Sequence, residues 1–120
     1  MLEERIGPLG GRAYLITDYC AGEPLIEAYL GGSEARRRLM DEAFSEFFDV
    51  LLRNRISHRD TKAANFLWCE DRLWALDLDS IRYHRSAAGA RAGSRRDRAI
   101  FLKSWQKTPA IHRHLAELIS

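Results

Sequence analysis

The pattern of apolar and polar positions predicts one long helix near the middle of the chain, over residues 33–53. Ser33 is suited to cap its first turn, because a serine hydroxyl can accept a hydrogen bond from a backbone N–H that has no partner within the helix. Apolar side chains recur along the helix every three or four residues and form a wide stripe. The members of this stripe are Met40, Phe44, Phe48 and Leu52, flanked by Leu39, Ala43 and Phe47. We expect it to form the core of the domain.

Shorter apolar runs predict the elements around this helix. A glycine-rich turn at 7–11 precedes a strand at 13–17 and a short helix at 25–30. Two apolar runs around a polar turn, between residues 66 and 76, predict a β-hairpin. After a loose segment at 85–94, helices are expected at 95–107 and from 109 onward, the last with a buried face of Ile111, Leu115, Leu118 and Ile119. The predicted fold class is therefore α+β and mainly helical.

The hairpin should bring together two polar residues that are distant in the sequence. Asn65 directly precedes its first strand and Asp77 follows its second. In an antiparallel pair, residues that face each other lie roughly 5 Å apart. An amide oxygen and a carboxylate are ligands that suit Mg²⁺, which usually shares them with substrate phosphates. The sequence therefore predicts a magnesium site at the open end of the hairpin.

Two charged residues just before the hairpin fit a transfer reaction beside such a site. Asp60 should lie at the edge of the metal site, where it can orient an attacking hydroxyl and accept its proton. Lys62 offers a mobile positive charge for the transferred phosphoryl group. Taken singly, each of these residues is more often a turn or a solvated residue. Their combination with the hairpin and Asp77 favours a phosphoryl-transfer site.

Overall composition is that of an ordinary globular domain, with 46% apolar residues, 30% charged residues and a net charge of +2 over 120 residues. No apolar run is long enough to cross a membrane and no signal peptide opens the chain, so we expect a cytoplasmic protein. A nucleic-acid partner is not expected. Cys20 and Cys69 lie within apolar runs, which favours buried reduced thiols over a disulfide or a metal site.

Arginine is concentrated in one segment. Residues 82–98 contain six arginines and a single acid, Asp97. Such a segment could contact phosphates or the headgroups of a membrane. A flexible, solvated linker between folded parts is an equally good interpretation.

The segment 58–65 matches the catalytic loop of protein kinases, H-R-D-x-x-x-x-N, at every specified position. Together with the L-D-L-D-S-I-R segment at 76–82 and the F-L-K-S-W tail at 101–105, it resembles the bacterial lipopolysaccharide core kinases, which phosphorylate heptose or Kdo sugars with ATP. The resemblance implies a protein-kinase-like C-terminal lobe at 23–120. It also implies one residual strand of the N-terminal lobe and the hinge at 1–22.

The resemblance assigns a role to each residue of the predicted reaction centre. It makes Asp60 the catalytic base and Lys62 a contact to the γ-phosphate of ATP. Asn65 and Asp77 become the Mg²⁺ ligands. The implied acceptor is a sugar of the lipopolysaccharide core or a similar anionic glycolipid, reached at the surface of the inner membrane.

The resemblance also implies supporting residues. His58 would brace the catalytic loop, and Arg59 and Asp79 would be supporting residues, Arg59 without an evident partner. Backbone groups of Asp18 and Cys20, in the hinge, would face the adenine of ATP.

The chain also departs from the kinase pattern. Leu78 and Asp79 replace the Phe and Gly of the D-F-G motif, no A-P-E motif follows, and there is no length for an activation loop, which favours a sugar or another small acceptor. The glycine-rich loop, the strand lysine and its glutamate partner do not precede Gly7. We therefore expect a truncated catalytic half that needs a separate N-lobe chain.

Other functions remain open from the sequence. The chain could be an inactive kinase-like fragment that binds anionic surfaces or a partner chain, and aminoglycoside-type phosphotransferases are a weaker rival within the kinase class. The strand at 13–17 is expected to have an unpaired edge, with an apolar face beside it open to water. On that basis the isolated chain should associate or bind a hydrophobic dye.

Overall fold

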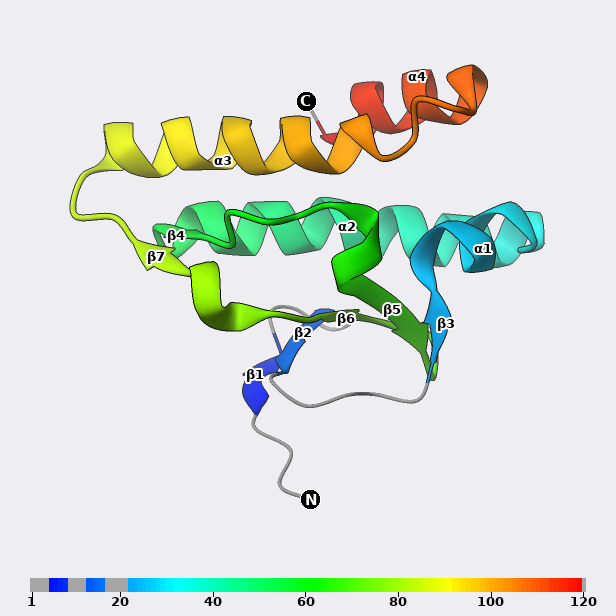
Figure 1. Ribbon diagram of the computed structural model, residues 1–120, viewed down its shortest axis with the longest axis horizontal. Helices are drawn as coiled ribbons and strands as arrows, with labels where there is room; N and C mark the ends of the chain where they lie inside the picture. Colours follow the sequence, from blue (N-terminus) through cyan, green and yellow to red (C-terminus); the bar gives the residue numbers. More distant parts are fainter. Residues whose placement is uncertain (1–4, 9–12, 17–21, 120) are drawn as a thin grey trace.

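The computed structural model describes residues 5–8, 13–16 and 22–119 of the chain. Figure 1 shows three layers: a sheet, then α2 with α1 beside it, then α3 and α4. In chain order the elements are β1 (Arg5–Pro8), β2 (Ala13–Ile16), β3 (Glu23–Pro24), α1 (Leu25–Leu30), α2 (Glu34–Arg53), β4 (Ile56–Ser57), η1 (Ala63–Asn65), β5 (Phe66–Cys69), β6 (Arg72–Ala75), η2 (Leu78–Ser80), β7 (Arg82–Tyr83), α3 (Ala87–Lys103) and α4 (Pro109–Ile119). The predicted class, α+β and mainly helical, is confirmed.

The predicted central helix is α2, and it begins as expected. Ser33 Oγ accepts a hydrogen bond of 3.1 Å from the backbone N–H of Arg36, so the first turn has its cap. The buried face carries most of the predicted stripe. It differs at the end of the helix, where Val50 and Leu51 are buried and Leu52 is only half-buried.

An aromatic cluster joins the three layers, and Phe101 of α3 lies at its centre. Its ring packs edge-on against those of Phe44, Phe48 and Phe66, with centroids 5.1, 5.4 and 5.7 Å away. Trp105, in the turn that follows α3, adds a ring at 5.8 Å. Edge-on contacts of this kind stabilise aromatic pairs beyond the area that they bury. Phe101 thus ties α3 to both α2 and the hairpin.

The predicted hairpin is confirmed as β5 and β6, paired from Phe66↔Ala75 to Cys69↔Arg72. Its turn consists of Glu70 and Asp71, which both have positive φ, 54° and 57°. Two consecutive left-handed residues make a tight turn whose twist matches that of the flanking strands. This turn sets the register and thereby the positions of the residues at the open end.

The sheet around the hairpin corrects the predicted unpaired edge. The strand order is β1-β2-β6-β5-β3, with β2 antiparallel to β1 and parallel to β6, so β2 has a partner on each side. On the neighbouring hairpin, Leu67 and Trp74 are only 8% and 5% exposed. The predicted association of the chain therefore no longer has an unpaired edge of β2 as its basis.

Two further sequence predictions are corrected. Gly7 and Pro8 belong to strand β1, where they pair with Leu15 and Tyr14, rather than to a turn. The loose segment predicted at 85–94 is largely helical, because α3 starts at residue 87, where the Ser86 side chain caps it by accepting the Gly89 N–H at 3.0 Å. The last helix begins at Pro109 as predicted.

No helix in the described part of the chain is both long and apolar enough to cross a membrane.

We expect Phe101→Ala to lower the free energy of unfolding by roughly 3–5 kcal/mol, because it removes the ring shared by α2, α3 and the hairpin. Urea denaturation followed by circular dichroism measures this. Leu30→Ala is the control: Leu30 is 44% exposed, and its change should stay within about 0.5 kcal/mol. Equal losses in the two variants would contradict the central place of Phe101.

Candidate active site

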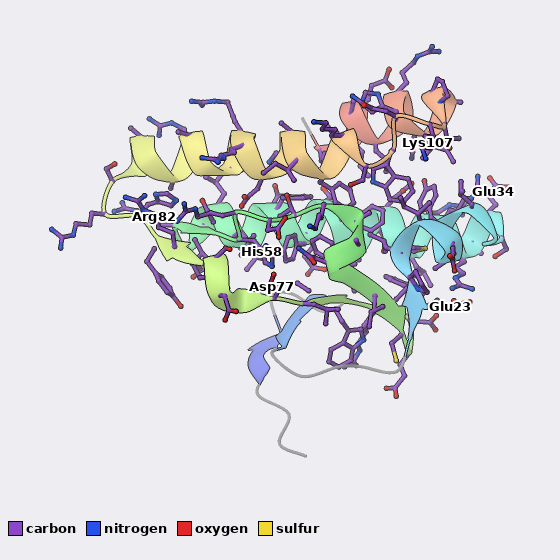
Figure 2. The ribbon with its side chains drawn as sticks, in the orientation of Figure 1. Glu23, Glu34, His58, Asp77, Arg82 and Lys107 are labelled. Atoms are coloured by element: carbon purple, nitrogen blue, oxygen red, sulfur yellow. The ribbon has the colours of Figure 1, made fainter. Side chains whose placement is uncertain are left out.

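The predicted catalytic loop, residues 58–65, connects β4 to the hairpin and ends in the 3-10 turn η1. In Figure 2, His58 lies close to α2, and Asp77 lies below it where the second hairpin strand ends. The loop has little regular secondary structure, so its shape depends on contacts with its neighbours.

The main brace of the loop is Asp97 of α3, which the sequence analysis did not assign to the site. Its carboxylate oxygens each accept a backbone N–H, Oδ2 from His58 and Oδ1 from Arg59, both at 2.9 Å. The Thr61 hydroxyl donates to the carbonyl of Asp97. Asp97 is 1% exposed, so these bonds form away from water, where an unpaired N–H would be costly. The loop is therefore fastened to α3 at residues 58, 59 and 61.

Burial raises the pKa of the Asp97 carboxyl above its ordinary value. The hydrogen bonds from His58 and Arg59 lower this pKa in turn, as do the imidazoles of His58 and His84, but the effect of burial is larger. The carboxylate is nevertheless buried here, where its two oxygens accept the two backbone N–H groups of the loop.

A second brace comes from the end of α3, where Ser104 Oγ accepts the backbone N–H of Ala63 at 2.9 Å. Asp97 and Ser104 thus hold the two ends of the loop to one helix. The lone acid in an arginine-rich segment was the signal that could have found Asp97. Ser104 had no such signal.

His58 is fully buried and links the loop to the hairpin. Its Nδ1 accepts the backbone N–H of Asp60 at 3.2 Å, so Nε2 carries the proton and donates to the carbonyl of Leu76 at 2.8 Å. The ring also stacks on Phe66 at 6.2 Å. These contacts agree with the predicted role of His58 as a brace.

Asp60 and Lys62 lie side by side, facing solvent in part. Lys62 Nζ is 3.9 Å from Asp60 Oδ2, and the two side chains are 57% and 32% exposed. At that distance and exposure the ion pair contributes little to stability. Both side chains therefore remain available to a ligand.

Asn65 and Asp77 lie at the open end of the hairpin. The backbone N–H of Leu76 donates to the carbonyl of Asn65 at 2.8 Å, which extends the hydrogen-bond ladder by one residue. Asp77 directly follows this last paired residue. Asn65 Nδ2 donates to the carbonyl of Asp60 at 2.8 Å, and among the described residues nothing donates to its amide oxygen, which can therefore act as a ligand.

The backbone is strained at two positions of the site. Asp77 has φ 55° and Arg59 has φ 76°, a region that costs an L-residue about 1–2 kcal/mol. At Arg59 the hydrogen bond to Asp97 holds this conformation. Strain that the surroundings maintain is common at functional sites.

The donor set suits Mg²⁺ rather than a softer metal, because a free amide oxygen and an exposed carboxylate are hard oxygen ligands. Within the described ranges, no three or more His, Cys, Asp or Glu side chains cluster to hold a metal ion. Two protein ligands fit a site in which phosphate oxygens and water complete the coordination.

The other residues predicted for the site either lie away from these ligands or fall outside the described residues. Arg59 is exposed and faces a separate pocket, described below. Asp79 is exposed in the short turn η2. Asp18 and Cys20, the predicted adenine contacts, lie outside the described residues, as does most of the predicted hinge.

No family model matches the chain, and no curated protein is significantly similar to it.

The Asp97→Asn substitution should lower stability by about 1–3 kcal/mol at neutral pH, because an amide has only one acceptor oxygen for two buried N–H groups.

The difference in stability between the wild type and Asp97→Asn should also depend on pH. Because the pKa of Asp97 is raised, the folded state binds its proton more tightly than the unfolded state does. The stability that this protonation contributes is fully present below the ordinary Asp pKa of about 3.9 and is lost as pH rises through the raised pKa. The advantage of the wild type over Asp97→Asn should therefore shrink over that pH range.

Urea denaturation at a series of pH values measures this difference. The surface carboxylate Asp49, 61% exposed beside Arg98, offers a matched control: Asp49→Asn should cost less than about 1 kcal/mol. A wild-type advantage that grows with pH over the same range would refute the direction of the Asp97 shift.

Proposed function

We propose that this chain carries the catalytic loop and metal ligands of an ATP- and Mg²⁺-dependent phosphotransferase that phosphorylates a sugar hydroxyl. One observation supports the proposal above others. The loop and the hairpin bring Asp60, Asn65 and Asp77 to one end of the hairpin through backbone and side-chain hydrogen bonds of 2.8 Å. These three residues were selected from the sequence, and their placement near one another supports the proposal.

In this proposal each residue has one task. Asp60 Oδ accepts the proton of the attacking hydroxyl and orients its oxygen. Lys62, whose Nζ lies 3.9 Å from Asp60 Oδ2, moves its charge to the transferred phosphoryl group. Asn65 and Asp77 would hold Mg²⁺, which when bound neutralises charge on the phosphate oxygens. His58 and Asp97 act only through the loop, as positioning residues.

A small acceptor is favoured by the short connection after the site. Residue 81 alone separates η2 from β7, which pairs with β4, and α3 begins four residues after β7 ends. No long segment lies there to bind an extended protein substrate. With the resemblance described above, we propose a lipopolysaccharide core sugar as acceptor, phosphorylated in the cytoplasm at the inner membrane.

A second candidate is a kinase-like binding module without activity. The observation that favours it is the closed hairpin face: Leu67 and Trp74 are less than a tenth exposed. That apolar surface adjoins Asn65 and Asp77 and would otherwise suit a nucleotide base. A chain that kept it covered would not bind ATP productively, and its site residues would serve only the fold.

Nucleotide binding separates the two candidates. We expect the wild-type chain to bind ATP with Mg²⁺ in isothermal titration, and Asp77→Ala to abolish the magnesium-dependent part because a ligand is removed. Glu117→Ala, an exposed carboxylate on α4, is the control and should bind as the wild type does. If the wild type binds no ATP, alone or with an added N-lobe chain, the inactive module is the correct interpretation.

The role of Asp60 is tested by turnover. Asp60→Asn should slow phosphoryl transfer from ATP to a lipopolysaccharide core acceptor by roughly 10²–10⁴-fold, the usual contribution of a general base. Nucleotide affinity should change little, because the amide keeps the size of the side chain and Asp60 is not a metal ligand. Unchanged turnover would rule out Asp60 as the base.

A further inference from the structure

A pocket of about 290 Å³ lies between the first half of α3 and the paired strands β4 and β7. Arg82, one of its lining residues, is at the β7 end of the molecule in Figure 2, far from Lys107 and Glu34. The pocket adjoins the catalytic loop through Arg59 and Asp97. It is distinct from the metal ligands Asn65 and Asp77, which do not line it.

The helix side of this pocket is formed by residues with little or no side chain: Gly89, Ala92 and Gly93. A Cβ atom at Gly93 would collide with Ser57 Oγ and would lie 2.7 Å from His84 Nε2. Ser57 Oγ and His84 Nε2 are themselves 2.6 Å apart and form a polar floor there. Gly93 therefore allows α3 to pack closely against Ser57 and His84 at the floor of the pocket.

Three arginines, Arg59, Arg82 and Arg96, surround this floor from three different elements. All three are exposed, and none of their guanidinium groups pairs with a side chain or carbonyl of the described residues. Other arginines of the chain are engaged in contacts, as the bonds of Arg36 to Glu23, Arg98 to Asp49 and Arg37 to Tyr29 show. Unpaired arginines occur elsewhere, Arg95 among them, but these three face one pocket.

The one acid of the pocket does not neutralise them. Both carboxylate oxygens of Asp97 accept backbone N–H groups of the catalytic loop, and the side chain is 1% exposed. Three guanidinium charges and one carboxylate leave the pocket with a net charge of about +2 when His84 is neutral. Like charges held together in this way favour a multivalent anion as their partner.

We propose that this pocket binds a phosphomonoester. Guanidinium groups donate paired hydrogen bonds to phosphate oxygens, and a phosphomonoester carries nearly two negative charges at neutral pH. The volume, at the lower limit of usual ligand pockets, accommodates a phosphate and a small group attached to it. Because Arg59 directly precedes Asp60, a phosphate bound here contacts the same loop that carries the proposed base.

The binding of glucose 6-phosphate and of inorganic phosphate tests this proposal, measured by isothermal titration in magnesium-free buffer. We expect saturable binding of both probes at one site, and at least a tenfold loss of affinity in Arg82→Gln/Arg96→Gln. The matched control is Arg95→Gln/Arg113→Gln, two exposed arginines outside the pocket with the same change in net charge. The control should bind as the wild type does.

The source of the phosphate and the independence of the site follow from two comparisons. Tighter binding of glucose 6-phosphate than of inorganic phosphate assigns the pocket to a phosphosugar, and equal affinities assign it to free phosphate. Binding should persist in Asp77→Ala, which separates this site from the proposed metal site and from any failure of the proposed activity. No saturable binding, or equal weakening in both arginine pairs, would overturn the proposal.

Discussion

The shape of the candidate site depends on a single buried carboxylate, that of Asp97. The loop from His58 to Asn65 contains only one short turn of regular structure, and nothing in its own sequence would hold two adjacent N–H groups in one direction. Asp97 accepts both at 2.9 Å and thereby keeps Arg59 at a positive φ. Without this acceptor the loop would have to satisfy those groups with water, and Asp60 would lose its position.

Burial of the Asp97 carboxylate costs free energy, and neighbouring groups offset part of this cost. Burial raises the pKa of Asp97, and two backbone N–H groups and the nearby imidazoles stabilise the charged form in part. The same side chain borders the arginine-lined pocket. Asp97 therefore contacts both the loop of the proposed reaction centre and the proposed anion site.

The aromatic core gives Asp97 a rigid support. Phe101 follows Asp97 by one helical turn, so both side chains lie on the same face of α3. Phe101 packs against rings from α2 and from the first hairpin strand. The helix α3, which braces the loop, is thus packed against the hairpin that carries Asn65 and Asp77 at its open end. This packing fixes the position of the loop relative to these two residues.

Local sequence was sufficient for the elements whose signals are local. The cap at Ser33, the helical spacing of α2, the two-residue turn of the hairpin and the proline at the start of α4 each act within a few residues. For the same reason the approach of Asn65 to Asp77 could be predicted, because an antiparallel register follows from the hairpin alone. The predicted step of four residues from Phe48 to Leu52 exceeds the 3.6 residues of a helical turn, so Leu51, four residues after Phe47, is buried and Leu52 is only half-buried.

Tertiary structure decided what depends on contacts between distant segments. Gly89 and Gly93 weaken the start of α3, whose alanines favour a helix, and a serine cap and close packing of Gly93 on Ser57 and His84 compensate for the glycines. Contacts between residues far apart in the chain likewise determine the partners of β2, the burial of Leu67 and Trp74, and the bonds of Asp97 to the loop. No periodicity encodes such pairings, because they arise only when packed helices and strands bring the groups within hydrogen-bonding reach.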